Sequence, residues 1–100
     1  MSRVTDILLI VSLEDAGIAP LQEALWRKCG FKLNNVSFHA GGNKYMQREV
    51  WAAAVNYLDP AIVAAEVGKV SWEWPESVQM LVAEDEDEAM SLVDLKERQR

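Results

Sequence analysis

The first predicted element is a strand at residues 7–11, where five branched apolar residues stand between Asp6 and Ser12. A run this short, rich in β-branched residues and followed by polar ones, is typical of a buried central strand. Because its side chains alternate between two sides, we expect the strand to be covered on both faces. The remaining elements are expected either to pair with this strand or to cover it.

An amphipathic helix is predicted next, because apolar residues recur at helical spacing at Ile18, Leu21, Leu25 and Cys29. Pro20 suits the first turn of a helix, and Gly30 stands where a left-handed residue commonly ends one.

A hairpin is predicted after a break at Asn34-Asn35. Residues 36–40 alternate apolar and polar as in a half-exposed strand, and residues 40–44 contain the Gly and Asn of a tight turn. The returning segment is rich in alanine, which also favours a helix. We assign residues 50–58 to a strand because Asp59-Pro60 is a strong helix start, in which Asp59 caps the helix that follows.

The second helix has an apolar stripe of Val63, Val67 and Val70 and is expected to stop either near Gly68 or in the loop at residues 71–75. Residues 78–82 alternate as another strand. The acidic residues that follow predict a tight turn. After this turn, residues 90–93 could pair with the preceding strand as a short final strand.

This order of elements predicts an α+β domain with the ferredoxin-like split βαβ plan (βαββαβ), an antiparallel sheet with two helices on one face. Right-handed crossovers would place the first and third strands in the middle of the sheet. These are the two strands that are apolar on both sides, and the agreement is the main reason for the prediction.

One domain is predicted at residues 1–95, followed by a polar tail at 96–100, since 100 residues of which half are apolar suit a single small core. No apolar run approaches the roughly 18–20 residues that span a bilayer, and the first residues are unlike a secretory signal. A lone cysteine, Cys29, suits a reducing compartment. We therefore expect a cytoplasmic protein that binds no membrane.

The acidity is concentrated in the last third of the chain. Residues 1–69 carry seven acids and seven bases, residues 70–95 carry eight acids and no base, and residues 96–100 carry three bases and one acid, for a net charge of −6. An acidic chain binds nucleic acid poorly, so we expect no direct binding to it.

Five consecutive acids, Glu84, Asp85, Glu86, Asp87 and Glu88, form the densest charge. They could guide a basic protein partner, imitate nucleic-acid phosphates or loosely hold a divalent cation. The favoured alternative is a solvated turn that only discourages aggregation. Metal is the weakest hypothesis, because the run lacks the spacing and central glycine of a calcium loop.

Two further groups of residues are candidate sites. Trp72 and Trp74 flank Glu73, and would anchor a partner if exposed or fill the end of the sheet if buried. The second group would form a ligand or dimer face on the uncovered side of the sheet, and consists of Trp51, Tyr57, His39 and Asn56. In the alternative, Trp51 and Tyr57 lie beneath the helices and the neighbouring alanines face outward.

We predict no catalytic residue, no metal site and no cofactor. The Gly-x-Ser-x-Gly, His-Glu-x-x-His and Cys-x-x-Cys patterns do not occur, and the glycine turn at 41–44 lacks phosphate-loop spacing. His39 is the sole histidine, which on an edge strand is usually a surface residue.

The second half of the chain, from Val50 through Leu58-Asp59-Pro60 to residues 74–82 and the acidic turn, is similar to small uncharacterised proteins of high-GC bacteria and their phages. The resemblance implies an accessory role without naming an activity, and no functional residue is carried over from it.

Two functional hypotheses stay open. The first is a non-enzymatic protein-interaction module, a phage or host accessory or regulatory factor, that binds a protein partner through its acidic third and the Trp72/Trp74 loop. The alternative is a ferredoxin-like homodimer that binds a small ligand, or is weakly catalytic, over the open sheet face. We expect a homodimer because two helices cannot cover strands that are apolar on both sides.

Overall fold

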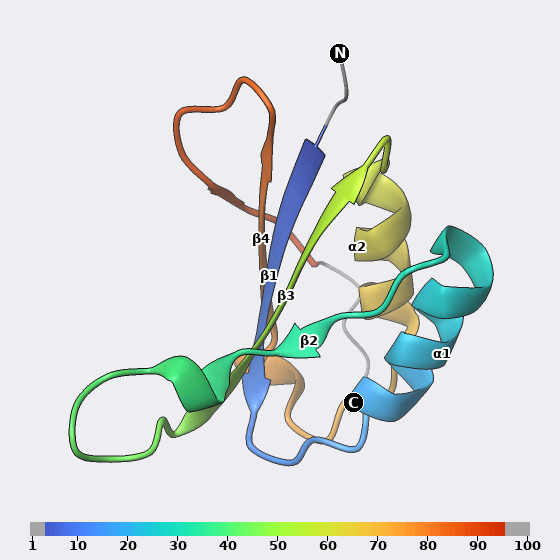
Figure 1. Ribbon diagram of the computed structural model, residues 1–100. Coiled ribbons are helices and arrows are strands. Elements are labelled where there is room, and N and C mark those ends of the chain that lie inside the picture. Colours follow the sequence, from blue (N-terminus) through green and yellow to red (C-terminus); the bar gives the residue numbers. More distant parts are fainter. Residues whose placement is uncertain (1–3, 96–100) are drawn as a thin grey trace.

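Residues 4–95 are described by a computed structural model, in which one long strand, β1 (Val4–Ser12), lies at the centre of an antiparallel sheet (Figure 1). The strand order is β2-β3-β1-β4-β5. The other strands are β2 (Asn34–Asn35), β3 (Arg48–Asn56), β4 (Gln79–Glu84) and β5 (Ser91–Leu92). The helices are α1 (Ile18–Cys29) and α2 (Pro60–Lys69), with 3-10 turns η1 (Ser37–His39) and η2 (Pro75–Ser77). The predicted α+β class, with an antiparallel sheet and two helices, is confirmed.

The inner strands pair along most of their length. β1 pairs with β3 from Val4↔Asn56 to Ser12↔Arg48, and with β4 from Thr5↔Glu84 to Ile10↔Gln79. The alanine-rich segment is therefore a central strand as predicted, although it begins at Arg48 and ends at Asn56. Tyr57 follows the strand directly, and its φ of 56° turns the chain towards α2.

The core lies between the sheet and the two helices. Every second residue of β1, from Thr5 to Val11, is buried on the side where both helices lie (Figure 1). The largest apolar contributors from the sheet and helices are Ile7, Leu9, Val11, Leu21, Leu25, Val63, Val67 and Met80. The intervening β1 residues are only half-buried or exposed. The expectation that β1 is covered on both faces is thus wrong within the described residues.

Both helices begin and end as their sequences predict. Gly30 follows α1 with a left-handed φ of 74° and donates its amide to the carbonyls of Leu25 and Trp26. The Asp59 carboxylate accepts a hydrogen bond of 3.0 Å from the Ala61 amide at the start of α2. The predicted cap of the second helix is confirmed.

The strand predicted at residues 36–40 is wrong. Asn34 and Asn35 are the strand, and the chain then turns through η1. Local side-chain bonds redirect it: Asn35 accepts the Ser37 amide at 3.0 Å, and the Ser37 hydroxyl accepts the Val50 amide at 2.7 Å. Such side-chain bonds to the backbone replace the regular bonds between strands.

The C-terminal hairpin forms as predicted, with β5 pairing to β4 through Leu81↔Leu92 and Val82↔Ser91. The predicted polar tail at 96–100 lies outside the described residues. Among residues 4–95, no helix is both long enough and apolar enough to cross a membrane.

Candidate functional site: the open face of the sheet

The side of the sheet that faces away from the helices carries a continuous apolar row. Directly paired residues of neighbouring strands place their side chains on the same side. Leu8 pairs with both Ala52 and Leu81, and Leu81 pairs with Leu92, so one row crosses β3, β1, β4 and β5. Next to this row, Ile10 pairs with Val50. We call these six residues the open face: Leu8, Ile10, Val50, Ala52, Leu81 and Leu92.

Within residues 4–95, neither helix covers the open face, and none of its six residues is fully buried. Five of them are partly buried, and Leu92 is 64% exposed. Both helices lie on the other side, and the loops that follow β2 and β4 project on the side of the open face (Figure 1). A contiguous apolar surface of this kind is typical of an interaction site.

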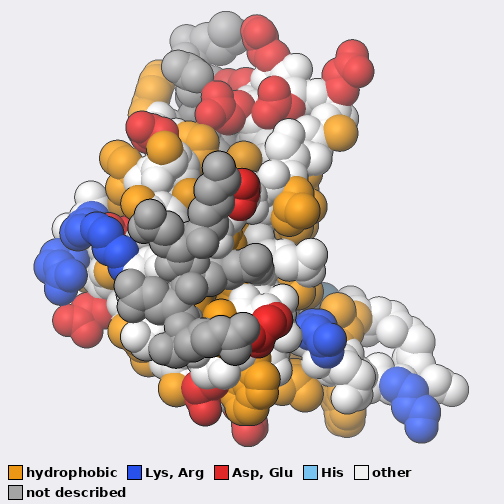
Figure 2. All heavy atoms as spheres, turned by 180° about the vertical axis from the view of Figure 1, so that it is seen from behind, with side chains coloured by type: hydrophobic (Ala, Val, Ile, Leu, Met, Phe, Trp, Pro, Cys, Tyr) orange, Lys and Arg blue, Asp and Glu red, His pale blue; other side chains and the backbone are white. Residues whose placement is uncertain are grey.

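An acidic loop, defined as residues 84–88, borders one end of the open face. In the space-filling view its Asp and Glu side chains gather at the upper end of the molecule (Figure 2). Two of the five carboxylates shape the loop: Asp87 accepts the Glu84 amide and Asp85 accepts the Val4 amide, each at 2.8 Å. Glu86 and Glu88 are exposed and present their charge to solvent. Asp6, on β1, adds an exposed acid at the same end of the face.

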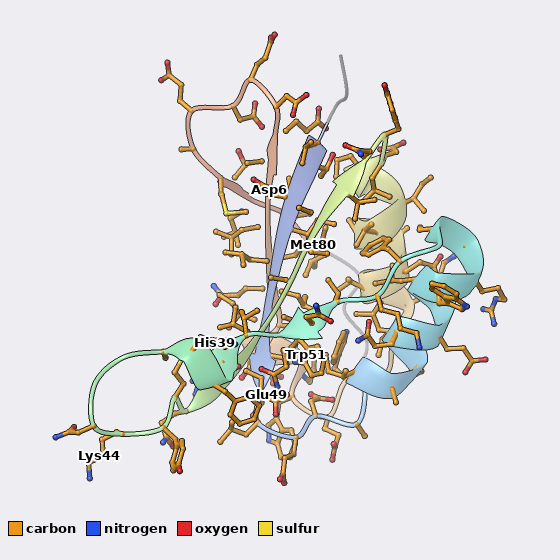
Figure 3. The ribbon with its side chains drawn as sticks, viewed as in Figure 1. Asp6, His39, Lys44, Glu49, Trp51 and Met80 are labelled. Carbon is orange, nitrogen blue, oxygen red and sulfur yellow. The ribbon has the colours of Figure 1, made fainter. Side chains whose placement is uncertain are left out.

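A basic loop, defined as residues 40–48, borders the opposite end, and Lys44 and Arg48 are its charged residues. Lys44 lies at the tip of the loop, far from the sheet (Figure 3). Arg48 pairs with Ser12 in the register, which puts it on the same side of the sheet as Ile10. Glu49 points to the other side, where its carboxylate accepts hydrogen bonds from the Trp51 indole and the Glu14 amide.

Two exposed aromatic residues, one before the basic loop and one within it, were not predicted as a site. Phe38 is 79% exposed and Tyr45 is 89% exposed. Together with Leu13, Met46 and Arg48 they line a cleft of about 410 Å³. The residues of this cleft come from three separate segments of the chain, which only the fold brings together. In the sequence, the one feature that indicated a site here was the unusual density of apolar residues in a turn.

The two tryptophans of the 71–75 loop have different environments. Trp72 is buried, and its indole donates a hydrogen bond of 2.9 Å to the Val67 carbonyl. Its ring fills the space beside Gly17, where any added Cβ would collide with it. Trp74 is about half exposed. Trp72 therefore cannot serve as an exposed anchor, and the alternative in which it fills the end of the sheet describes its place.

The same loop is tied to the segment after β1 by Asp15. This buried carboxylate accepts backbone amides from Gly17 at 2.8 Å, Glu73 at 3.2 Å and Trp74 at 3.1 Å. Glu73 in turn accepts the Ala16 amide at 2.7 Å. The loop is thus held in place at the end of the sheet opposite the acidic loop, so the two parts of the predicted partner-binding surface are not adjacent.

The four residues predicted as a ligand or dimer face do not share a surface. Trp51 packs against the core on the helix side (Figure 3), and Asn56 belongs to the opposite side of β3. Tyr57 lies beyond the end of β3 and is 71% exposed, and His39 lies in η1. Trp51 lies on the face of β3 beneath the helices, and Ala52 lies on the other face. For Trp51, this arrangement is the alternative given above, in which it lies beneath the helices.

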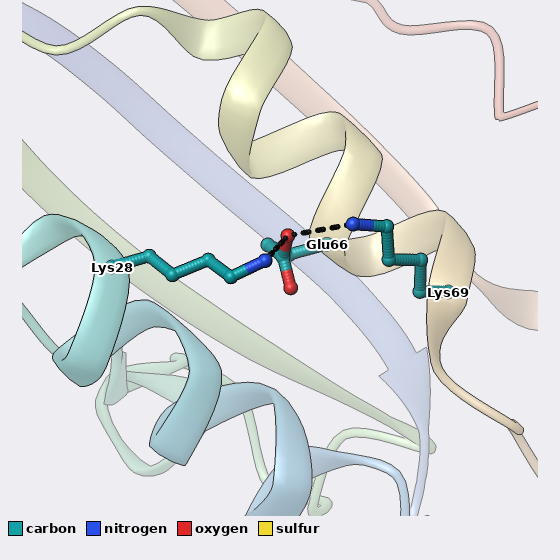
Figure 4. A network of polar contacts seen from close by, with 3 residues as sticks. All are labelled: Lys28, Glu66 and Lys69. Atoms are coloured by element: carbon teal, nitrogen blue, oxygen red, sulfur yellow. Dashed lines mark hydrogen bonds and ion pairs between the residues drawn. The ribbon is translucent and has the colours of Figure 1, made fainter.

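A carboxylate between the helices has a structural role. Glu66 is buried at the contact of α1 and α2, and its Oε2 accepts hydrogen bonds from Lys28 at 2.8 Å and Lys69 at 3.2 Å (Figure 4). The hydrogen bond from Lys28 is the main cause that lowers the pKa of the Glu66 carboxyl, and the same bond raises the pKa of Lys28. Burial, and then Glu66, raise the pKa of the nearby Cys29 thiol, which disfavours the reactive thiolate.

Within the described part of the chain, no group of three His, Cys, Asp or Glu side chains is arranged to hold a metal ion. The five consecutive acids are spread around a turn, with two of them bonded to backbone amides. The acidic loop is thus better suited to long-range attraction than to chelation.

Comparison with protein-family models, with curated proteins and with solved structures finds no match to this chain. The resemblance of its second half to bacterial and phage proteins therefore stays a prediction.

Proposed function

We propose that this chain is a non-enzymatic protein-interaction module that binds through its open face. The single observation that carries the proposal is the apolar row of Leu8, Ala52, Leu81 and Leu92 on the side of the sheet without helices. Exposing such a row to water is unfavourable by about 25 cal/mol for each Å² that a partner could bury. A partner surface removes that cost.

The charges at the two ends of the face define the chemistry of the partner. Its surface carries an apolar strip, with basic residues placed to meet the acidic loop and acidic residues placed to meet Lys44 and Arg48. This revises the hypothesis in which Trp72 is an anchor, because Trp72 is buried. The acidic loop keeps its proposed role in attracting the partner, which opposite charges accelerate.

The order of elements supports a finer description of the fold. With β1 and β3 inside and β2 and β4 beside them, we propose the ferredoxin-like split βαβ plan, extended by β5. A cytoplasmic accessory or regulatory role, in a bacterium or a phage, is the biological setting that we propose for the module.

A photo-crosslinking amino acid at position 81 tests the proposed surface in cells of the native host. Leu81 lies in the middle of the open face, and Glu23 on the exposed side of α1 is the matched control position. We expect a discrete covalent protein adduct from position 81 and none from position 23. Absence of an adduct at position 81, or the same adducts at both positions, would contradict the proposal.

A further inference from the structure

We infer that the partner of the open face is a second copy of this chain, bound face to face with its strands reversed. The inference rests on the proposed function and adds the identity of the partner. Its starting point is the order of side chains along one side of β1 and its neighbours. The exposed acid Asp6 comes first, Leu8 and Ile10 follow, and Arg48 lies beside Ser12 at the other end.

This arrangement is complementary to itself in one orientation. A two-fold axis that runs across the strands, between Leu8 and Ile10, brings Asp6 of each copy towards Arg48 of the other. The same axis brings each acidic loop to the end of the other copy's sheet that carries its basic loop, and sets the two apolar rows against each other. An axis parallel to the strands would instead set acid against acid, which is unfavourable. The distribution of charge therefore selects a single orientation of the dimer.

The size of the sheet explains why the loops belong to the interface. Three long strands spaced about 4.8 Å apart, with about six residues each at about 3.4 Å, outline roughly 300 Å² in projection. A stable interface takes about 800 Å² of accessible surface from each partner. The central strands alone fall short of that area, so the two charged loops, which project on the same side (Figure 1), have to complete it.

Two charge-reversed variants test both the partner and the orientation. The first, K44E/R48E, makes both ends of the face acidic. The second, D6K/E86K/E88K, places a base opposite Arg48 of the other copy and lowers the net charge of the acidic loop from −5 to −1, while it keeps Asp85 and Asp87, which hold the loop. Sedimentation equilibrium at low salt should show a wild-type dimer. Each variant alone should have a Kd weaker by on the order of tenfold or more, because like charges then face each other.

Mixing the two variants is the decisive measurement. In equal amounts they should form a one-to-one heterodimer that binds more tightly than either variant alone does. In it, Arg48 of one variant meets Asp6 of the other, and the Arg48→Glu substitution meets the Asp6→Lys substitution. In a dimer with the opposite orientation, like ends already face each other, so neither variant alone would weaken the Kd. Far-UV circular dichroism and thermal unfolding confirm that each variant is folded. Leu81→Lys, in the middle of the open face, should abolish both the homodimer and the heterodimer.

Three outcomes would overturn the inference: a wild-type monomer at concentrations on the order of 100 μM, variants with an unchanged Kd, or no recovery in the mixture. Its failure can be told apart from failure of the proposed function. A monomer that forms an adduct with a different protein at position 81 retains the interaction module and loses only the second copy as its partner.

Discussion

At the scale of single residues, Asp15 shows how one buried carboxylate connects distant parts of the chain. It accepts three backbone amides and joins the segment after β1 to the loop that holds Trp72. A Ser, Thr or Ala at this position could not accept from all three. Asp15, in the short segment between β1 and α1, thus helps to determine the path of a loop 58 residues further along the chain.

Replacing Asp15 with Asn should lower the free energy of unfolding by about 1–3 kcal/mol, as measured by urea denaturation. Asn presents an NH₂ group where Oδ2 now accepts the Trp74 amide, so two donors face each other and one amide loses its acceptor. The control is Glu23→Gln on the exposed surface of α1, which should change stability by less than about 0.5 kcal/mol. Equal effects of both substitutions would show that Asp15 does not hold the loop.

Glu66 should make folding stability depend on pH in the acidic range. Its pKa in the folded protein is lowered from an ordinary value of 4.5, chiefly by the hydrogen bond from Lys28. A lowered folded-state pKa means that the stabilisation is fully present above 4.5 and is lost as pH falls through the folded-state pKa. The difference in free energy of unfolding between wild type and Glu66→Gln should therefore shrink between neutral pH and about pH 3. A difference that stays constant over this range would contradict the assigned role.

At the scale of elements, the start of α2 is determined locally. Asp59→Ala should destabilise the protein by about 1 kcal/mol in thermal or urea unfolding, because it removes the side chain that accepts the Ala61 amide. Asp59→Asn is the matched control, since Asn caps helices about as well as Asp. If Asn were as harmful as Ala, the charge of Asp59 and not its capping bond would be responsible.

At the edge of the sheet, the alternation of apolar and polar residues did not predict the short strand β2 correctly. Residues 36–40 alternate as a strand should, yet Asn35 and Ser37 bond to nearby backbone amides and turn the chain into η1. An edge strand has only one neighbour, so few backbone bonds between strands oppose this local alternative. The inner strand β3 has partners on both sides, and it forms despite its alanines.

At the scale of the whole molecule, the two charged ends of the open face should make self-association sensitive to salt. We expect the dimer Kd to rise as salt shortens the screening length from about 10 Å at 0.1 M towards 3 Å at 1 M. Glu86→Gln/Glu88→Gln should flatten this dependence and leave the unfolding temperature nearly unchanged, because neither residue is buried. Sedimentation across a salt series measures both. The same salt slope in wild type and variant would show that the acidic loop is only a solubilising turn.

The sequence alone determined the elements whose signals are local. The apolar run of β1, the Gly30 end of α1 and the Asp59-Pro60 start of α2 act within a few residues of themselves, so they could be recognised without a fold. The apolar residues on both sides of β1 and β3 also indicated that both are inner strands. These features follow from backbone geometry and from side chains that bond to their own neighbourhood.

The tertiary structure decided which side of each strand the helices cover, and with it the location of the candidate site. Because β1 is apolar on both sides, its sequence cannot distinguish the buried Leu9 from the uncovered Leu8. The difference arises when α1 and α2, after separate crossovers, pack on the same side of the sheet. The burial of Trp72 beside Gly17 and the position of the two charged loops at opposite ends of one apolar face depend in the same way on contacts between segments far apart in the chain.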